Sequence, residues 1–144
     1  MPKANAEEAQ EAELRGGTEL LHGGISRAIL GAFYSVHSEL GFGFLEAVYV
    51  NSLVVLLTRA GIGVERQVSF DILFHGHSVG NYRADLIVES LIIVEVKAGR
   101  SIIPQHMAQL FNYLRASRLQ VGLLLNFGER AEFRRVVCTG HSPR

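Results

Sequence analysis

Cysteine is almost missing from the 144 residues, and tryptophan is missing altogether. The single cysteine, Cys138, excludes a disulfide within the chain and any zinc site built from several thiolates. A lone cysteine near the end of a strand is most simply an inert apolar side chain. Neither the redox compartment nor a bound metal can therefore be inferred from thiols.

Long apolar runs are lacking as well. No stretch approaches the roughly 20 apolar residues that span a bilayer, and the first residues have neither segment of a signal peptide. We therefore expect a soluble, cytoplasmic protein without a membrane partner. Segment 1–24 is rich in glutamate and predicts a polar, flexible N-terminal arm, which leaves one domain over 25–144.

A net charge is also lacking, but the charges are segregated along the chain. Residues 1–96 carry 6 Lys and Arg against 12 Asp and Glu, and residues 97–144 carry 8 against 2, so the two parts stand at −6 and +6. A basic C-terminal part is suited to a polyanion, because phosphate contacts depend on local charge. Two solvated faces that attract each other explain the same pattern.

What the sequence does contain is regular apolar periodicity. Apolar residues that recur every three or four positions predict three helices, over 25–40, 44–60 and 104–116. Alternating or continuous apolar runs predict five strands, over 64–74, 79–88, 91–96, 121–127 and 133–139. We expect Leu45 and Val48 to point inward from the second helix. Alternation places Val68, Phe70, Ile72 and Phe74 on one face of the first strand.

The connections between these elements predict the sheet. Short turns join the first three strands, so they should form an antiparallel meander. A helix separates the third strand from the fourth, and such a crossover favours a parallel pair. The more polar run 133–139 should form an edge strand. The predicted class is α/β, with a mixed sheet of about four to five strands in the order ααβββαββ.

The third strand carries two charges at the end of an apolar run. Alternation places Glu95 and Lys97 on one face, and Asp85 lies ten residues earlier on the preceding strand. Two neighbouring carboxylates need a cation, and Mg²⁺ prefers hard oxygen ligands of this kind. An internal ion-pair network that includes Arg83 is the alternative explanation.

Three more polar residues could border this cluster. Gln109 and Tyr113 are four residues apart and project from the same side of the third helix. Glu46 begins the second helix, where a carboxylate complements the helix dipole, and it could also reach the acidic cluster. An ordinary surface role is the simpler explanation of the pair, and helix capping is the simpler explanation of Glu46.

Histidine and arginine residues elsewhere fit simpler roles. His37 lies near the apolar stripe of the first helix and fits a hydrogen-bonded core histidine better than a ligand. His106 fits the start of the third helix better than a substrate contact. The remaining candidates are expected to be solvated, and they are His75, His77, Arg134 and Arg135.

Several motifs in order resemble one known family. Gly43 to Tyr49 matches the GxxExxY signature, and the chain over about 25–137 is similar to the small bacterial GxxExxY proteins of the PD-(D/E)XK nuclease-like superfamily. The further matching segments are 82–85, 95–97, 109–114 and 122–128. Ala84 precedes Asp85 where the superfamily name has proline, a position that shapes the backbone and not the chemistry.

The resemblance implies a restriction-endonuclease-like core and a set of roles. Asp85, Glu95 and the Val96 carbonyl would bind Mg²⁺, for which Mn²⁺ could substitute, and Glu46 would support the metal through water. Lys97 would orient or activate the attacking water. Gln109 and Tyr113 would border the site and hold nucleic acid.

The implied function is metal-dependent hydrolysis of phosphodiester bonds, with DNA as the expected substrate. An alternative is a weakly active or non-catalytic module that binds nucleic acid or a protein partner on a nuclease scaffold. A purely structural domain is the third hypothesis. A homodimer, formed for example through edge strand 133–139, is expected by analogy with other small nucleases.

Overall fold

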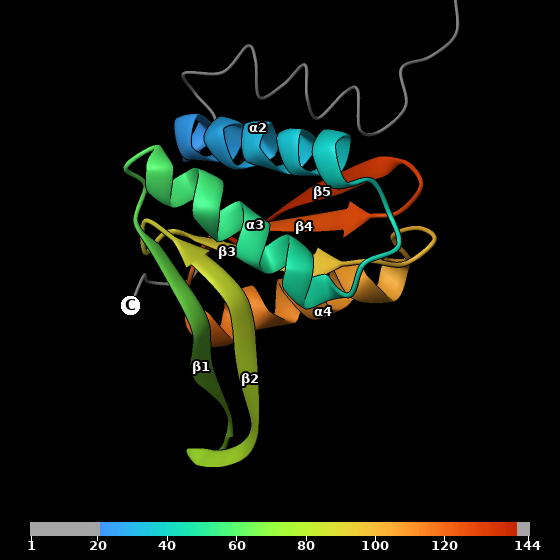
Figure 1. Cartoon of the computed structure of the whole chain (residues 1–144). Helices are drawn as coiled ribbons and strands as arrows, with labels where there is room; N and C mark the ends of the chain where they lie inside the picture. The colour runs from blue at the N-terminus through green and yellow to red at the C-terminus, as the bar shows by residue number, and fades with distance from the viewer. Residues whose placement is uncertain (1–20, 141–144) are drawn as a thin grey trace, which may run out of the picture.

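The computed structural model describes residues 21–140, and its chain begins with two helices that pack on each other (Figure 1). Helix α2 spans Gly23–Leu40 and helix α3 spans Glu46–Arg59. The predicted N-terminal arm 1–24 lies outside the described residues except for its last four positions. No helix within residues 21–140 is long and apolar enough to cross a membrane.

The five predicted strands are all present in one mixed sheet. Strand order is β1-β2-β3-β4-β5, with β3 and β4 parallel and the other neighbours antiparallel. The meander, the parallel pair and the edge position of the last strand are therefore confirmed. The strands are β1 (Val64–Phe74), β2 (His77–Val88), β3 (Ile92–Lys97), β4 (Val121–Phe127) and β5 (Ala131–Val137).

Helices cover both faces of this sheet, as the predicted α/β class requires (Figure 1). Helices α2 and α3 pack on one face against residues such as Val94 and Val96, and helix α4 (Pro104–Ser117) packs on the other face. At Gly122 of β4, a Cβ atom would lie 2.9 Å from a methyl of Leu110. The missing side chain lets α4 approach the sheet closely.

Two inward predictions were wrong, and the apolar face predicted for β1 is not covered at its end. Leu45 is 82% exposed and Val48 is exposed, because α3 begins at Glu46 and buries the stripe Tyr49, Val50, Leu53 and Leu57. Phe74 is also exposed. The β1–β2 register shifts between Ile72 and Leu73, and the end of this hairpin extends beyond the helices (Figure 1).

The β1–β2 hairpin leaves the sheet at one defined level. Strand β2 pairs with β3 only from Leu86 to Val88, whereas its pairing with β1 continues to the hairpin turn. At that level Gln67 has a φ of 52°, and Ala84 and Leu86 face opposite sides of the sheet although they are two residues apart. This interruption of the β1–β2 ladder leaves the register unchanged, since Arg66 pairs with Leu86 and Val68 pairs with Ala84. It opens a fork between β2 and β3.

Candidate metal-binding active site

The fork between β2 and β3 holds the two predicted carboxylates. Leu86 pairs with Val94 as the last ladder partners, so Asp85 and Glu95 are the next residues on the two strands. Their side chains take over from the ladder: the Val96 N–H donates to Asp85 Oδ2 at 2.9 Å, and the Asp85 N–H donates to Glu95 Oε1 at 3.2 Å. The sequence separation of ten residues thus becomes direct proximity.

This position is electrostatically unfavourable for two negative charges. Burial raises the pKa of Glu95 to about 7, and the neighbouring Asp85 carboxylate adds to the rise. Burial also raises the pKa of Asp85, although the hydrogen bond from Val96 and the Lys97 ammonium oppose it. The ordinary reason to retain such a pair at neutral pH is a proton or a cation bound between the carboxylates.

Tyr82 is a neighbour of this pair to which the sequence analysis gave no role. Its hydroxyl donates to Glu95 Oε1, and its ring stacks on Tyr113 with centroids 3.5 Å apart and planes 8° apart. Burial and the Glu95 carboxylate raise the pKa of Tyr82 well above its ordinary value, so the phenol stays a neutral donor. The one feature of the sequence that could have indicated Tyr82 is its position directly before the Arg83-Ala84-Asp85 segment.

Helix α4 forms the opposite wall of the site. A small pocket of about 240 Å³ is lined by Glu95 and Lys97 of β3 and by His106, Gln109 and Tyr113 of α4. Lys97 and Glu95 share this face with Ile93, as alternation predicts, while Val94 and Val96 lie in the core on the other face. The structure therefore gathers five of the predicted site residues: Asp85, Glu95, Lys97, Gln109 and Tyr113.

Glu46 is not part of this gathering. It starts α3 beyond the opposite face of the sheet, and among residues 21–140 no group of three or more acidic, histidine or cysteine side chains could hold a metal. Burial and the Lys97 charge lower the pKa of His106, while the Glu46 charge opposes them, so Glu46 lies within electrostatic range of the site. A direct ligand role for Glu46 has no geometric support.

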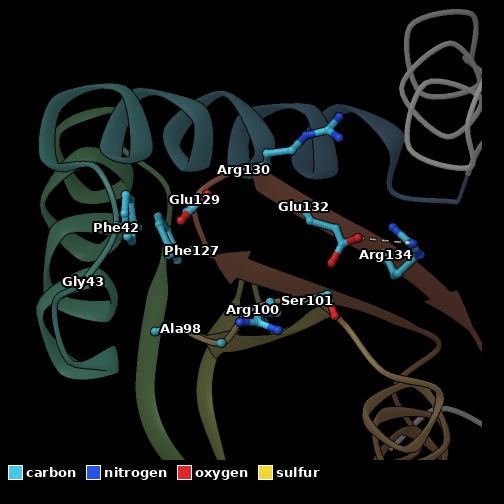
Figure 2. Close-up of a pocket in the computed structure, with 12 residues that line it drawn as sticks. Phe42, Gly43, Ala98, Arg100, Ser101, Phe127, Glu129, Arg130, Glu132 and Arg134 are labelled. Carbon is cyan, nitrogen blue, oxygen red and sulfur yellow. Dashed lines mark ion pairs between the residues drawn. The ribbon is translucent and has the colours of Figure 1, made fainter.

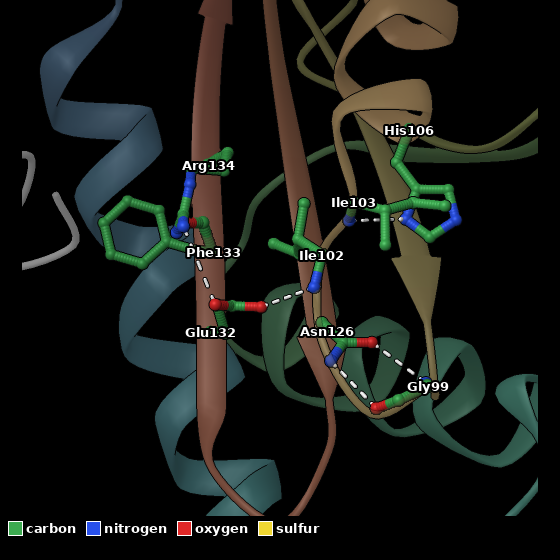
Figure 3. Close-up of polar contacts among 8 residues, drawn as sticks. All are labelled: Gly99, Ile102, Ile103, His106, Asn126, Glu132, Phe133 and Arg134. Carbon is green, nitrogen blue, oxygen red and sulfur yellow. Dashed lines mark hydrogen bonds and ion pairs between the residues drawn. The ribbon is translucent and has the colours of Figure 1, made fainter.

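Asn126 organises the loop that follows Lys97, and the sequence analysis missed it. It is buried on β4 in register with Lys97, and its side chain bonds the Gly99 N–H and the Gly99 carbonyl at 3.0 Å each (Figure 3). Glu132 of β5 accepts the Ile102 N–H of the same loop. The signal was one amide side chain inside an otherwise apolar buried run.

A second hollow, of about 920 Å³, lies beyond the ends of β3 and β4 and contains neither carboxylate of the fork (Figure 2). Phe42 and Arg100 contribute to its lining, together with the paired Arg134 and Glu132, 3.6 Å apart. Volume alone would favour this hollow as a functional site. The smaller pocket is favoured instead, because Glu95 lines it, has a raised pKa and accepts a hydrogen bond from the Asp85 N–H.

The histidines among the remaining candidates take the simpler roles expected of them, whereas Arg134 and Arg135 are half-buried and not solvated as expected. His37 Nε2 lies 2.8 Å from the Gly128 carbonyl oxygen, as a hydrogen-bonded core histidine should. His106 Nδ1 accepts the Ile103 N–H at the start of α4 (Figure 3). Arg135 donates to the Leu21 carbonyl, Cys138 is buried, and His75 and His77 are exposed at the hairpin turn.

The mixed sheet, its helical cover and the forked carboxylate strands define a restriction-endonuclease-like α/β protein. Residues 24–136 match the PD-(D/E)XK nuclease superfamily, and the chain belongs to that superfamily. The crystal structure of SSO0001 has a TM-score of 0.53 at 23% identity, over 64% of this chain and 50% of that one. This likeness shows the fold alone. A comparison with curated proteins gives no match.

Proposed function

We propose that this protein is a Mg²⁺-dependent nuclease that hydrolyses phosphodiester bonds in DNA, with Mn²⁺ able to replace Mg²⁺. The observation that carries the proposal is the Asp85–Glu95 pair at the fork, which is held together although both pKa values are raised. Membership of the PD-(D/E)XK superfamily, whose nucleases generally use divalent metals, supports the same chemistry.

The donor set at the fork fits a hard divalent cation. Asp85 and Glu95 offer carboxylate oxygens, which Mg²⁺ prefers, and a cation would relieve the repulsion between them. The Val96 N–H points to Asp85, and in a strand the carbonyl of the same residue faces the same edge. Val96 is therefore suited to supply a third, main-chain oxygen.

The residues around the pair have distinct tasks in this proposal. A bound divalent ion supplies a water of lowered pKa and a positive charge beside the scissile phosphate. Lys97 holds a fixed positive charge on the face of Glu95, where negative charge develops during hydrolysis. Tyr82 orients Glu95, and Gln109 and Tyr113 offer hydrogen-bonding groups to the bound strand. Glu46 would support the metal through a bridging water, or it would serve only to complement the dipole at the start of α3.

Finer features of the proposal rest on the sequence motifs. We place the chain in the GxxExxY family, and Tyr49 gives its motif a structural role. The Tyr49 hydroxyl donates to the Gly41 carbonyl and accepts the Phe44 N–H, which fixes the loop before Glu46. We also propose one nuclease domain over residues 25–144, with segment 1–24 as a separate arm, and a homodimer formed through edge strand β5.

Cleavage assays test the proposal directly. Labelled single- and double-stranded DNA and RNA would be incubated with the wild-type chain and Mg²⁺ or Mn²⁺. We expect Asp85→Ala to abolish cleavage, because it removes one of two carboxylates at the fork. Glu65→Ala is the matched control, since Glu65 is an exposed carboxylate on β1 that bonds Ser90. Absence of cleavage of every substrate, together with no metal binding by calorimetry, would overturn the proposal.

One observation favours a second candidate function, a binding module on the nuclease scaffold. Within residues 21–140 the fork offers only two clustered carboxylates, and protein donors already bond to both. Asp85→Ala discriminates the two functions when affinity and turnover are measured on the same oligonucleotide. A binding module keeps its affinity and shows no turnover in either form, whereas a nuclease loses turnover in the variant.

A further inference from the structure

A groove runs from the proposed active site along helix α4. Its volume is about 850 Å³, and β1 of the projecting hairpin forms one wall while α4 forms the other. Gln109 and Tyr113 line both this groove and the small pocket with Glu95 and Lys97. A polymer bound at the carboxylates could therefore continue into the groove without leaving the protein surface.

The α4 wall of the groove is cationic. Arg115 in the last turn of α4 and Arg118 directly after its last residue are exposed there, and neither forms a salt bridge with another residue of the described part of the chain. Asp71 of the opposite wall is hydrogen-bonded to Ser78. Basic residues at a helix C-terminus also complement the helix dipole. Arg59 occupies the corresponding place on α3, on the other face of the sheet. It therefore serves as a control that separates a role in the groove from a role at a helix C-terminus.

Apart from Asp71, the β1 wall of the groove is apolar. Ile72 and Leu73 line it, and Leu73 is 63% exposed, so an apolar surface faces the arginines across the groove. A single nucleic-acid strand has this same division, with charged phosphates on one side and accessible base faces on the other. A duplex hides its base faces, and the Asp and Glu side chains of an acidic peptide have no rings to place on such a wall.

We propose that the groove between the β1–β2 hairpin and α4 binds a single strand of nucleic acid next to the cleavage site. Arg115 and Arg118 contact successive phosphates, Asn112 lies between them and the active site, and the bases lie against Ile72 and Leu73. The inference rests on the proposed nuclease function and specifies its substrate as single-stranded or locally unpaired nucleic acid.

The salt dependence of binding measures these phosphate contacts. Fluorescence anisotropy would follow a labelled oligothymidylate with the wild-type chain in EDTA, which prevents metal-dependent cleavage, between 50 and 200 mM salt. Each lost phosphate contact lowers the slope of log K against log salt by roughly 0.7 for a single strand. We expect this reduction in both Arg115→Ala and Arg118→Ala, and a smaller effect of each on a duplex of equal length.

Arg59→Ala is the matched control, since it removes the same charge from the last turn of a helix away from the groove. Slopes of Arg115→Ala and Arg118→Ala equal to the slope of Arg59→Ala would overturn the inference. Absence of binding, or displacement of the oligonucleotide by polyglutamate of equal charge, would overturn it too. If binding depends on both arginines but no substrate is cleaved with Mg²⁺, the nuclease function fails and the groove stands. If the chain cleaves nucleic acid but the slopes of Arg115→Ala and Arg118→Ala equal that of wild type, the nuclease function stands and the groove inference fails.

Discussion

At the scale of a single residue, Glu95 is the side chain on which the proposed chemistry depends most. Alternation along the third strand predicted which face of the sheet the Glu95 side chain occupies. Because an isolated buried carboxylate costs free energy, Glu95 was also expected to have a polar or charged partner. The partners themselves came from elsewhere in the fold: Asp85 and Tyr82 of β2, across the fork. Tyr82 in turn stacks on Tyr113, so the phenol that holds Glu95 is itself positioned by α4.

The raised pKa of Glu95 predicts a pH-dependent cost to stability. Its pKa is about 7 in the folded chain against 4.5 for the ordinary group, so the folded state binds more protons between these values and loses stability as pH rises through them. Each pKa unit corresponds to about 1.4 kcal/mol, which bounds the full cost near 3 kcal/mol.

In metal-free buffer we expect Glu95→Gln to be more stable than wild type at pH 8, by at most about 3 kcal/mol, and equally stable near pH 4. Urea unfolding at both pH values measures this. Glu65→Gln, an exposed carboxylate, should show no such difference. A Glu95→Gln effect that does not change with pH contradicts the assignment. A stabilised variant that cleaves as fast as wild type would support the purely structural hypothesis for the pair.

At the scale of elements, the interruption of the β1–β2 ladder at Gln67 and Asp85 decides where the site lies. Residues 64–74 and 79–88 read as two ordinary strands of one sheet, and their pairing was predicted correctly. The sequence did not indicate that β2 leaves β3 at Asp85, because the departure depends on how Gln67 and Asp85 interrupt the ladder together. The site and the groove beside α4 both follow from this departure.

The loop between β3 and α4 provides an element-scale prediction. Asn126→Ala leaves the N–H and the carbonyl of Gly99 without their side-chain partners, and we expect it to destabilise the fold by about 1–3 kcal/mol. It should also lower cleavage, because this loop follows Lys97 directly. Urea unfolding and initial rates measure the two effects.

Ser52→Ala is the control for this loss, since the exposed Ser52 hydroxyl bonds a carbonyl within α3 and contributes little. If Asn126→Ala and Ser52→Ala have equal stability and equal rates, the side-chain bonds of Asn126 do not organise the loop.

At the scale of the whole molecule, opposite charges from the two parts of the chain meet at one site. Segment 1–96, which has a net negative charge, contributes Asp85 and Glu95. Segment 97–144, which has a net positive charge, contributes Lys97, Arg115 and Arg118. A net charge of zero therefore conceals a cationic groove that leads to a carboxylate pair. The groove would attract phosphate groups, and a cation at the carboxylates would relieve their repulsion of a phosphate that reaches the fork.

Metal binding should therefore stabilise the whole fold in a pH-dependent way. If Mg²⁺ binds at the fork as proposed, it competes there with a proton, so the rise in melting temperature should be larger at pH 8 than at pH 6. Differential scanning calorimetry with and without Mg²⁺ measures the shift. Asp85→Asn should remove most of it, and an equal shift in this variant would place the metal elsewhere.

The sequence by itself determined the elements, the strand order and the common face of Glu95 and Lys97, because these depend on short-range periodicity and on connection lengths. Tertiary structure alone decided the rest. It brought Asp85 to Glu95, added Tyr82 and Asn126, kept Glu46 apart from the carboxylates and left Leu45 exposed. These outcomes depend on where strands diverge and how helices pack, and a local sequence pattern does not specify contacts between residues that are far apart in the chain.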